Sequence, residues 1–171
     1  TAKQQTSVNN FAAESQHDSI RCFGSVFPYA ENALEEMRRI KELGLYGIKL
    51  HPDYQEFFIG DDAALPIYAE AEKLGLPIAF HTGRDPYSPS LVHCPPDVLA
   101  KIADLFPNLT IIAAHMGGMD MPEAAAQYLA GKSNVYFDTA FASHFLTPGQ
   151  LEELIRLHGV DRVLFATDCP W

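Results

Sequence analysis

The chain has 171 residues, of which 47% are hydrophobic and 20% are charged, and this composition is typical of a globular domain with ample apolar side chains for a core. The formal net charge of -10 disfavours a nucleic-acid backbone or an anionic membrane surface as a partner. Three cysteines without a pairing pattern and the lack of any long apolar run favour a cytoplasmic protein without disulfides or membrane spans.

Apolar runs and helical periodicity predict strands that alternate with helices along the whole chain. The strands are expected at residues 20–27, 46–50, 76–81, 109–115, 134–141 and 163–168. The helices are expected at residues 7–16, 30–43, 65–74, 97–106, 122–129 and 148–157. Gly44 stands where the second helix needs a C-terminal cap, and Thr147 with Gln150 fits a capping box before the last helix. This alternation is typical of a (β/α) barrel or a doubly wound parallel sheet.

The sequence favours the barrel over the doubly wound sheet. Neither a G-x-G-x-x-G motif nor a Walker motif follows any predicted strand, so a nucleotide-binding sheet is disfavoured. An eight-unit barrel needs about 250 residues, which leaves this chain short by roughly two units. We therefore expect one domain over residues 1–171 that is an internal fragment of a longer protein.

Three predicted strands end in a side chain that can bind a metal ion. These residues are His81, His115 and Asp168, and each stands at the end of a mostly apolar run. Strand residues two apart point to the same face, and each of the three has an alanine two positions earlier. Small residues beneath three polar groups would leave room for an ion or a small substrate.

Five short motifs stand in order along the chain. They are GIKLHP at residues 47–52, FHTG at 80–83, AHMGG at 114–118, NVYFD at 134–138 and LFATDCP at 164–170. Together they resemble the amidohydrolase superfamily, in its amidohydrolase-2 branch of metal-dependent hydrolases and decarboxylases. The resemblance implies a TIM barrel, present here without its first two strands and its last helix. It also implies an H-x-H pair of metal ligands on the first strand, and no H-x-H occurs in this sequence.

The resemblance implies that His81, His115 and Asp168 end strands five, six and eight and bind a divalent metal ion, expected to be Zn²⁺. Asp168 would also handle the proton of an attacking water. His115 would either bind a second metal ion or donate and accept protons beside a single one. Three other histidines are interpreted as surface or hydrogen-bonded structural residues: His17, His144 and His158.

Four further residues are candidates for binding the substrate. Lys49 and His51 share one face of their strand, and Tyr54 and Arg84 stand in the loops that follow predicted strands. Related enzymes with two metal ions can carry a carboxylated lysine on strand four, and Lys49 occupies that place in the resemblance. Asp138 is expected to hydrogen-bond loop amides.

The sequence thus predicts a hydrolase in which the metal ion lowers the pKa of a bound water toward ~7. Asp168 would take the proton, and the hydroxide would attack a C–N or C–O carbonyl centre of an amide, ester or lactone. The first alternative is a non-oxidative decarboxylase of an aromatic or unsaturated acid, with Arg84 or Lys49 facing the carboxylate. The second is a non-catalytic barrel fragment with an incomplete metal site. A small-molecule substrate is the expected partner, and assembly into a homo-oligomer is left open.

Overall fold

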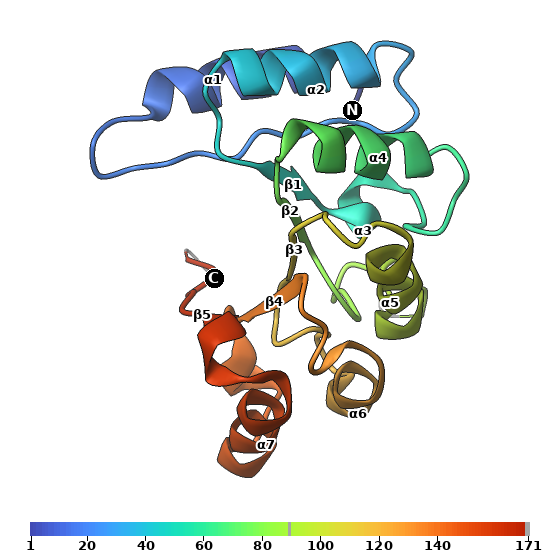
Figure 1. Cartoon of the computed structure of the whole chain (residues 1–171), viewed down its shortest axis with the longest axis vertical. Coiled ribbons are helices and arrows are strands. Elements are labelled where there is room, and N and C mark those ends of the chain that lie inside the picture. Colours follow the sequence, from blue (N-terminus) through green and yellow to red (C-terminus); the bar gives the residue numbers. More distant parts are fainter. Residues whose placement is uncertain (89, 170–171) are drawn as a thin grey trace.

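The computed structural model describes residues 1–88 and 90–169 (Figure 1). One parallel sheet runs through it in the order β1-β2-β3-β4-β5. The strands are β1 (Ile48–Leu50), β2 (Ile78–Phe80), β3 (Ile111–Ala113), β4 (Val135–Asp138) and β5 (Val163–Leu164). The α-helices are α1 (Gln5–Ser15), α2 (Ala33–Glu42), α3 (Pro52–Gln55), α4 (Leu65–Leu74), α5 (Pro96–Leu105), α6 (Pro122–Ala124) and α7 (Pro148–His158). A π-helical turn η1 (Ala125–Leu129) and the 3-10 turns η2 (Ala142–His144) and η3 (Val160–Arg162) complete the described elements.

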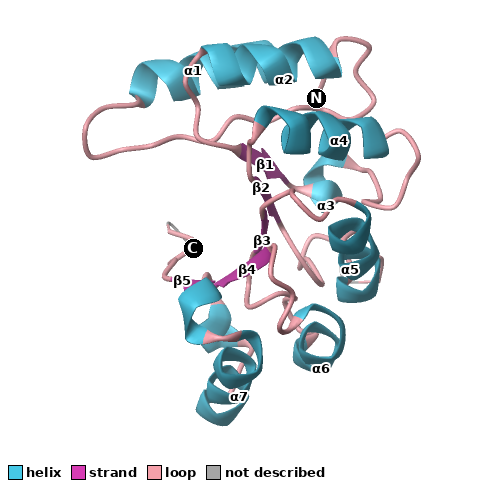
Figure 2. Cartoon of the chain, in the orientation of Figure 1, coloured by secondary structure: helices cyan, strands magenta, loops and turns pink. Residues whose placement is uncertain are grey.

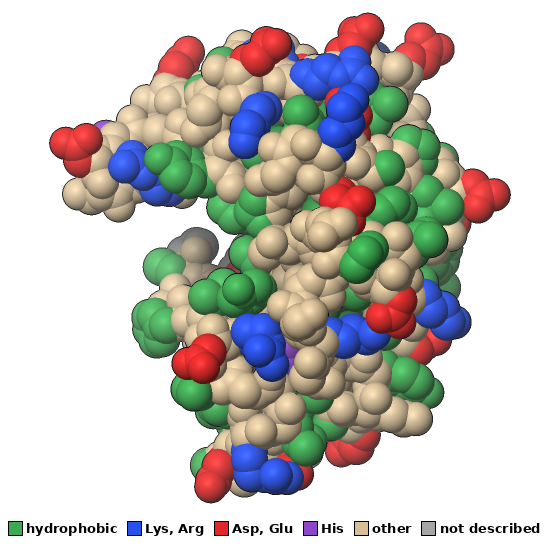
Figure 3. All heavy atoms as spheres, viewed as in Figure 1, with side chains coloured by type: hydrophobic (Ala, Val, Ile, Leu, Met, Phe, Trp, Pro, Cys, Tyr) green, Lys and Arg blue, Asp and Glu red, His purple; other side chains and the backbone are tan. Residues whose placement is uncertain are grey.

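The sheet is a curved, open segment with helices along its outer side. In Figure 2 the helices α4 to α7 follow one side of the row of strands, and the other side is left uncovered. Figure 3 shows a hollow on that uncovered side of the molecule. Neighbouring strands follow one another in chain order without reversal, as in a barrel segment and unlike a doubly wound sheet.

Burial alternates along the strands. In β1, β2 and β3 the first and third residues are buried and the middle residue is half-buried. The register aligns the middle residues Lys49, Ala79 and Ile112, which therefore share the uncovered concave face. The apolar runs suggested strands buried on both faces, and the second face is only half-buried because the sheet does not close.

The predicted helices form where local signals are strong. The helix α4 has the predicted bounds, and Gly75 follows it with a left-handed φ of 65°. Before α7, the hydroxyl of Thr147 accepts the Gln150 amide at 3.3 Å while Gln150 Oε1 accepts the Thr147 amide at 3.0 Å, as the capping box predicts. None of the helices described in residues 1–88 and 90–169 is long and apolar enough to cross a membrane.

The prediction of a regular strand at residues 20–27 is wrong. The segment is extended, but it forms only one parallel bridge to β1, at Gly24. Gly24 exchanges backbone hydrogen bonds with β1, donating to Gly47 at 2.9 Å and accepting from Lys49 at 2.7 Å. On the outer side, the Asn9 side chain accepts from the Ser25 amide at 2.7 Å and donates to the Ser25 carbonyl at 2.9 Å. Side chains of α1 thus take the place of a neighbouring strand.

Three further expectations need correction. The loop after His51 contains the short helix α3, which starts at Pro52 with His51 as its N-cap. The helix predicted at residues 122–129 is α6 followed by the π-helical turn η1, which packs against α5 and α7. The last strand stops at Leu164 and does not reach Asp168, because the Thr139 hydroxyl binds both the amide and the carbonyl of Ala166. Pro170 of the last motif lies outside the described residues.

Candidate functional site

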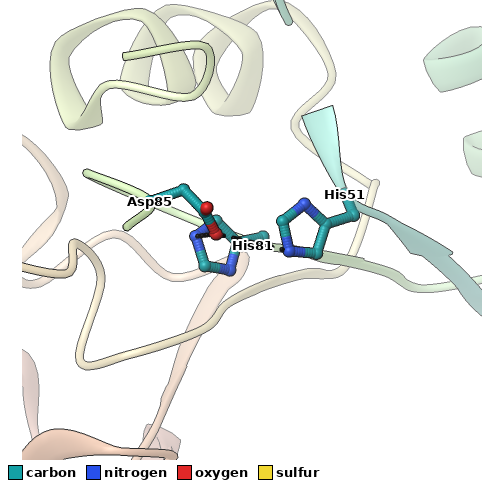
Figure 4. A group of neighbouring side chains, drawn as sticks. All are labelled: His51, His81 and Asp85. Carbon is teal, nitrogen blue, oxygen red and sulfur yellow. Dashed lines mark ion pairs between the residues drawn. The ribbon is translucent and has the colours of Figure 1, made fainter. Parts of the chain in front are cut away.

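The ends of β1 and β2 bring two histidines face to face. His51 follows Leu50 and His81 follows Phe80, and these two strand residues are partners in the parallel ladder. The His81 amide continues the ladder by donating to the Leu50 carbonyl at 3.0 Å. The two imidazole rings therefore stack, with centroids 4.2 Å apart and planes 13° from parallel. Figure 4 shows them side by side, with Asp85 next to His81.

His115 reaches the same place through a left-handed turn. Its φ is 60°, and its amide donates to Asp138 Oδ1 at 2.9 Å, as expected of a carboxylate that binds loop amides. Ala113 pairs with Phe80 on the buried, helix-covered face, so the predicted common face of Ala113 and His115 is wrong. The turn, rather than strand alternation, places His115 Nε2 3.0 Å from His81 Nδ1.

Two hydrogen bonds assign the protons of this pair of rings. The Ala140 carbonyl lies 3.0 Å from His115 Nδ1 and can only accept, so Nδ1 carries the hydrogen. In the neutral ring His115 Nε2 then accepts from His81 Nδ1, which leaves His81 Nε2 with a bare lone pair. Burial is the largest cause that lowers the pKa of His81 to about 2, followed by His51, His115 and Lys49, so this ring stays neutral.

The bare lone pair of His81 faces a carboxylate. His81 Nε2 lies 3.1 Å from Asp85 Oδ2, yet within residues 1–88 and 90–169 this nitrogen makes no hydrogen bond. Both side chains are buried, and a cation beside these two electron-rich atoms would stabilise them. Ligand atoms of His51, His81 and Asp85 all lie within 4.8 Å of one another, so these residues fit a metal ion.

His51 fits the ion less closely than the other two residues. Its Nε2 lies 3.6 Å from Asp85 Oδ2, and its Nδ1 accepts the Tyr54 amide over 3.4 Å. A neutral ring with this bond carries its hydrogen on Nε2, so binding an ion through Nε2 requires the long bond to break. Burial is the largest cause that lowers the pKa of His51 and Lys49 adds to it, whereas Asp85 and Asp53 act in the opposite direction.

A cavity of about 310 Å³ opens beside these groups and has aromatic walls. The rings of Tyr54, Tyr87 and Phe141 contribute to its lining. Tyr54 stacks on His51 with centroids 3.9 Å apart and meets the edge of Tyr87 at 5.4 Å. A flat ligand placed here would therefore contact both aromatic rings and the histidine cluster.

The cavity also contains charged groups of both signs. Lys49, Asp85 and Asp168 line it together with His81 and His115. Burial is the largest cause that lowers the pKa of Lys49, whereas the carboxylates of Asp138 and Asp168 act in the opposite direction.

Most of the residues singled out in the sequence meet at this cavity. Its lining includes Lys49, His51, Tyr54, His81, His115 and Asp168. Asp168 is exposed, has a left-handed φ of 60° and lies outside the His51–His81–Asp85 group. Arg84 is exposed and is absent from the lining as far as the structure describes it, and its amide donates to the Met119 carbonyl at 2.9 Å. Metal, proton-transfer and substrate roles for these residues remain predictions.

Asp85 received no role from the sequence. The available signal is its place in the loop directly after a strand-end histidine, where barrel enzymes carry functional groups. Gly83 allows the loop to bring Asp85 back toward His81. Its φ is 92°, and a Cβ at this position would lie 2.3 Å from the Met119 nitrogen. The Gly83 amide also donates to the Cys94 carbonyl at 2.9 Å, which ties both ends of the loop together.

Comparison with known proteins identifies a family and several relatives of this chain. The family described as Amidohydrolase matches residues 1–171. The 2-amino-3-carboxymuconate-6-semialdehyde decarboxylase of Dictyostelium discoideum is 32% identical over 105 residues, which cover 52% of this chain and 29% of that protein. A TIM-barrel protein from Bordetella bronchiseptica matches with a TM-score of 0.77 and 22% identity, over 97% of this chain and 59% of the other. A dihydroxybenzoic acid decarboxylase from Polaromonas, with bound manganese and the inhibitor 2-nitroresorcinol, matches with a TM-score of 0.71 and 20% identity, over 99% of this chain and 65% of the other.

These matches bear on fold and family in different ways. The solved structures confirm the predicted fold, a partial TIM barrel whose sheet is not closed. The chain spans less than two thirds of the length of each of these three relatives. The family match, in contrast, extends over every residue from 1 to 171. The chain therefore belongs to the amidohydrolase family, as its five motifs predict.

Proposed function

We propose that this chain carries the core of a metal-dependent decarboxylase that acts on a planar aromatic or unsaturated carboxylic acid. The observation that carries the proposal is the joint presence, in one cavity, of aromatic walls, the half-buried Lys49 and the His51–His81–Asp85 group. Two of the relatives are named as decarboxylases of unsaturated or aromatic acids. These names favour a decarboxylase, the first alternative in the sequence analysis, over the hydrolase that the sequence itself predicts.

The metal ion would be held by His81 and Asp85, with His51 as the third ligand. A bound divalent cation would supply Lewis-acid polarisation of an oxygen of the substrate. Nitrogen and carboxylate donors suit Zn²⁺, as predicted from the sequence, and Mn²⁺, which one relative binds. We give Mn²⁺ the same standing as Zn²⁺ for this reason.

The residues of the chain itself would bind and orient the acid. The ammonium of Lys49 would pair with the substrate carboxylate or an adjacent hydroxyl, since it lies on the concave face at the cavity. Tyr54, Tyr87 and Phe141 would stack against the planar skeleton and exclude water.

Loss of carbon dioxide breaks a carbon–carbon bond, leaves the electron pair on the former carboxylate-bearing carbon and requires a proton at that carbon. Asp168 and His115 line the cavity, and we assign proton delivery to Asp168. Both ring nitrogens of His115 are engaged by Ala140 and His81, whereas Asp168 is exposed to solvent and can recover its proton from water.

Hydrolysis of an amide, ester or lactone is the second candidate. Asp168 supports it, because this carboxylate lines the cavity but lies outside the His51–His81–Asp85 group and so can accept a proton from an attacking water. The decarboxylase is preferred because a hydrolase has no comparable need for Lys49 among aromatic walls.

The test compares release of carbon dioxide with hydrolysis in the same preparation. The chain is loaded with Mn²⁺ or Zn²⁺ and incubated with hydroxybenzoates, unsaturated dicarboxylates, aryl esters and lactones. Carbon dioxide from the acids, and its loss in a Lys49→Met variant that still binds metal, are the expected results. Hydrolysis alone would establish the second candidate, and neither activity in a metal-loaded chain would favour the non-catalytic barrel fragment.

A further inference from the structure

A second buried carboxylate, Asp53, lies near the metal-binding group and outside the cavity lining. It belongs to α3, two residues after His51, and the residue is 2% exposed. Asp53 Oδ1 accepts a hydrogen bond from the Ser88 hydroxyl and lies 2.8 Å from His93 Nδ1. Both partners belong to the loop between β2 and α5 that also carries Asp85. A single oxygen thus holds this loop at two points.

The other oxygen of Asp53 points to a role for the carboxylate besides stability. Within residues 1–88 and 90–169, Asp53 Oδ2 is buried and has no hydrogen-bond partner. A buried carboxylate with one unpaired oxygen is unfavourable for folding, and native proteins rarely keep such groups without another reason.

The contacts of Ser88 connect Asp53 to the ion-binding carboxylate. The Ser88 amide donates to the Asp85 carbonyl at 3.1 Å, and the Tyr87 amide donates to Asp85 Oδ1 at 2.6 Å. Asp85 therefore heads a tight turn that ends at Ser88, and Ser88 is anchored on Asp53. The remaining oxygen, Asp85 Oδ2, points at His81 and His51.

His93 anchors the far end of the same loop. Its ring stacks on Phe58 with centroids 4.6 Å apart, and its carbonyl accepts the Ile59 amide at 3.2 Å. Because His51 and Asp53 are joined by one residue of backbone, fixing Ser88 and His93 to Asp53 also fixes the separation between His51 and Asp85. The loop could otherwise move away from the strand ends.

We propose that Asp53 is a positioning residue that holds Asp85 Oδ2 against His51 and His81, and so sets the affinity of the site for a divalent cation. The proposal rests on the metal site of the proposed function. Residues that orient metal ligands typically change affinity 10–100-fold when they are replaced. We expect Asp53→Ala to weaken Mn²⁺ or Co²⁺ binding about tenfold or more.

A neutral side chain of the same shape should restore most of the affinity. In Asp53→Asn, the amide oxygen can still accept from Ser88 and His93, so the loop stays anchored. We expect Asp53→Asn to bind within about threefold of the unchanged protein. The Ser88→Ala variant should weaken binding in the same direction as Asp53→Ala, and the double variant should lose less than the two losses multiplied together.

A matched control is Glu70→Ala, which removes another buried carboxylate. Glu70 belongs to α4, pairs with Arg38 at 2.7 Å and is not among the residues that line the cavity. This variant should unfold more easily and bind metal with unchanged affinity. A loss of affinity that merely follows stability would therefore appear in Glu70→Ala as well.

The experiment measures Mn²⁺ affinity by calorimetry and the visible absorption of bound Co²⁺ in the whole chain and in each variant. Weaker binding and an altered Co²⁺ spectrum in Asp53→Ala, with rescue in Asp53→Asn, support the proposal. Equal losses of affinity in Asp53→Ala and Asp53→Asn would assign the effect to charge. No loss in Asp53→Ala would assign Asp53 to packing alone. Either result overturns the proposal. If the unchanged chain binds neither ion, the proposed metal site fails instead. Hydrogen exchange of the Ser88 amide then decides separately whether Asp53 anchors the loop, because exchange should accelerate in Asp53→Ala and stay slow in Glu70→Ala.

Discussion

His158 offers a quantitative test of the packing beneath the sheet. Its ring is fully buried and stacks on Phe137 with centroids 3.8 Å apart. His158 Nδ1 accepts the Gly131 amide at 3.2 Å, so Nε2 carries the hydrogen that it shares with the Val135 carbonyl at 3.1 Å. Both contacts suit a neutral ring and leave no place for a second proton. The sequence assigned His158 a structural role, and the structure confirms it.

The expected pH dependence follows from this environment. Burial is the largest cause that lowers the pKa of His158 from 6.5 to about 4, and the positive charge of Arg162 adds to it. Below pH 6.5 the ring takes up a proton in the unfolded chain but not in the folded one. The stabilisation is therefore complete above pH 6.5 and is lost as the pH falls toward 4. At about 1.4 kcal/mol for each tenfold difference in proton affinity, the loss is about 3 kcal/mol.

Urea unfolding followed by circular dichroism at pH 7 and pH 4.5 measures this loss. His158→Gln keeps a donor for Val135 and has no titrating ring, so its free energy of unfolding should change less between the two pH values. The exposed His17→Gln serves as the matched control and should behave like the unchanged protein. An identical pH dependence in His158→Gln and the unchanged protein would refute the argument. A ring resonance of His158 that titrates near pH 6.5 would refute it as well, without any need for a variant.

Four further outcomes are expected. Asp85→Asn should weaken Mn²⁺ binding at least tenfold in calorimetry, because the amide removes the negative charge that faces the bare lone pair of His81. Asp168→Asn should lower turnover by orders of magnitude at saturating metal, whereas His81→Ala should lower metal content itself, and elemental analysis beside the rate assay separates the two. Gly83→Ala should destabilise the fold by about 3 kcal/mol or more in thermal unfolding, because its Cβ would overlap backbone at 2.3 Å. Gly149→Ala, where a Cβ meets nothing within 4 Å, should instead stabilise α7 by about 0.5–1 kcal/mol.

Elements with signals inside their own segment could be predicted from the sequence. The bounds of α4 follow from its apolar periodicity and from Gly75. The start of α7 follows from the pairing of Thr147 with Gln150. His81 was found because a buried strand that ends in a polar residue must place that residue at the rim of the sheet.

The remaining parts depend on contacts between distant segments. Strand alternation misassigned the face of His115, because nothing in the apolar run announces the left-handed turn that follows Ala113. Asp85 stayed without a role because its loop returns to His81 only through the close approach of Gly83 to the neighbouring loop. The motifs established the family, whereas the choice between hydrolase and decarboxylase depends on side chains that meet only in the folded chain.

The amide side chains of α1 also bear on strand addition at this edge of the sheet. An exposed edge of a sheet is a template on which a strand from another molecule can add. Asn9 occupies the donor and the acceptor of Ser25, and Gln5 occupies the Phe27 amide at 3.0 Å, so an incoming strand finds no free backbone groups at these positions. The side chains of α1 therefore block this edge of the sheet. An Asn9→Leu variant would keep the helix but leave the amide and the carbonyl of Ser25 open to a strand from another molecule. Intermolecular β-structure in that variant would grow from residues 25–27.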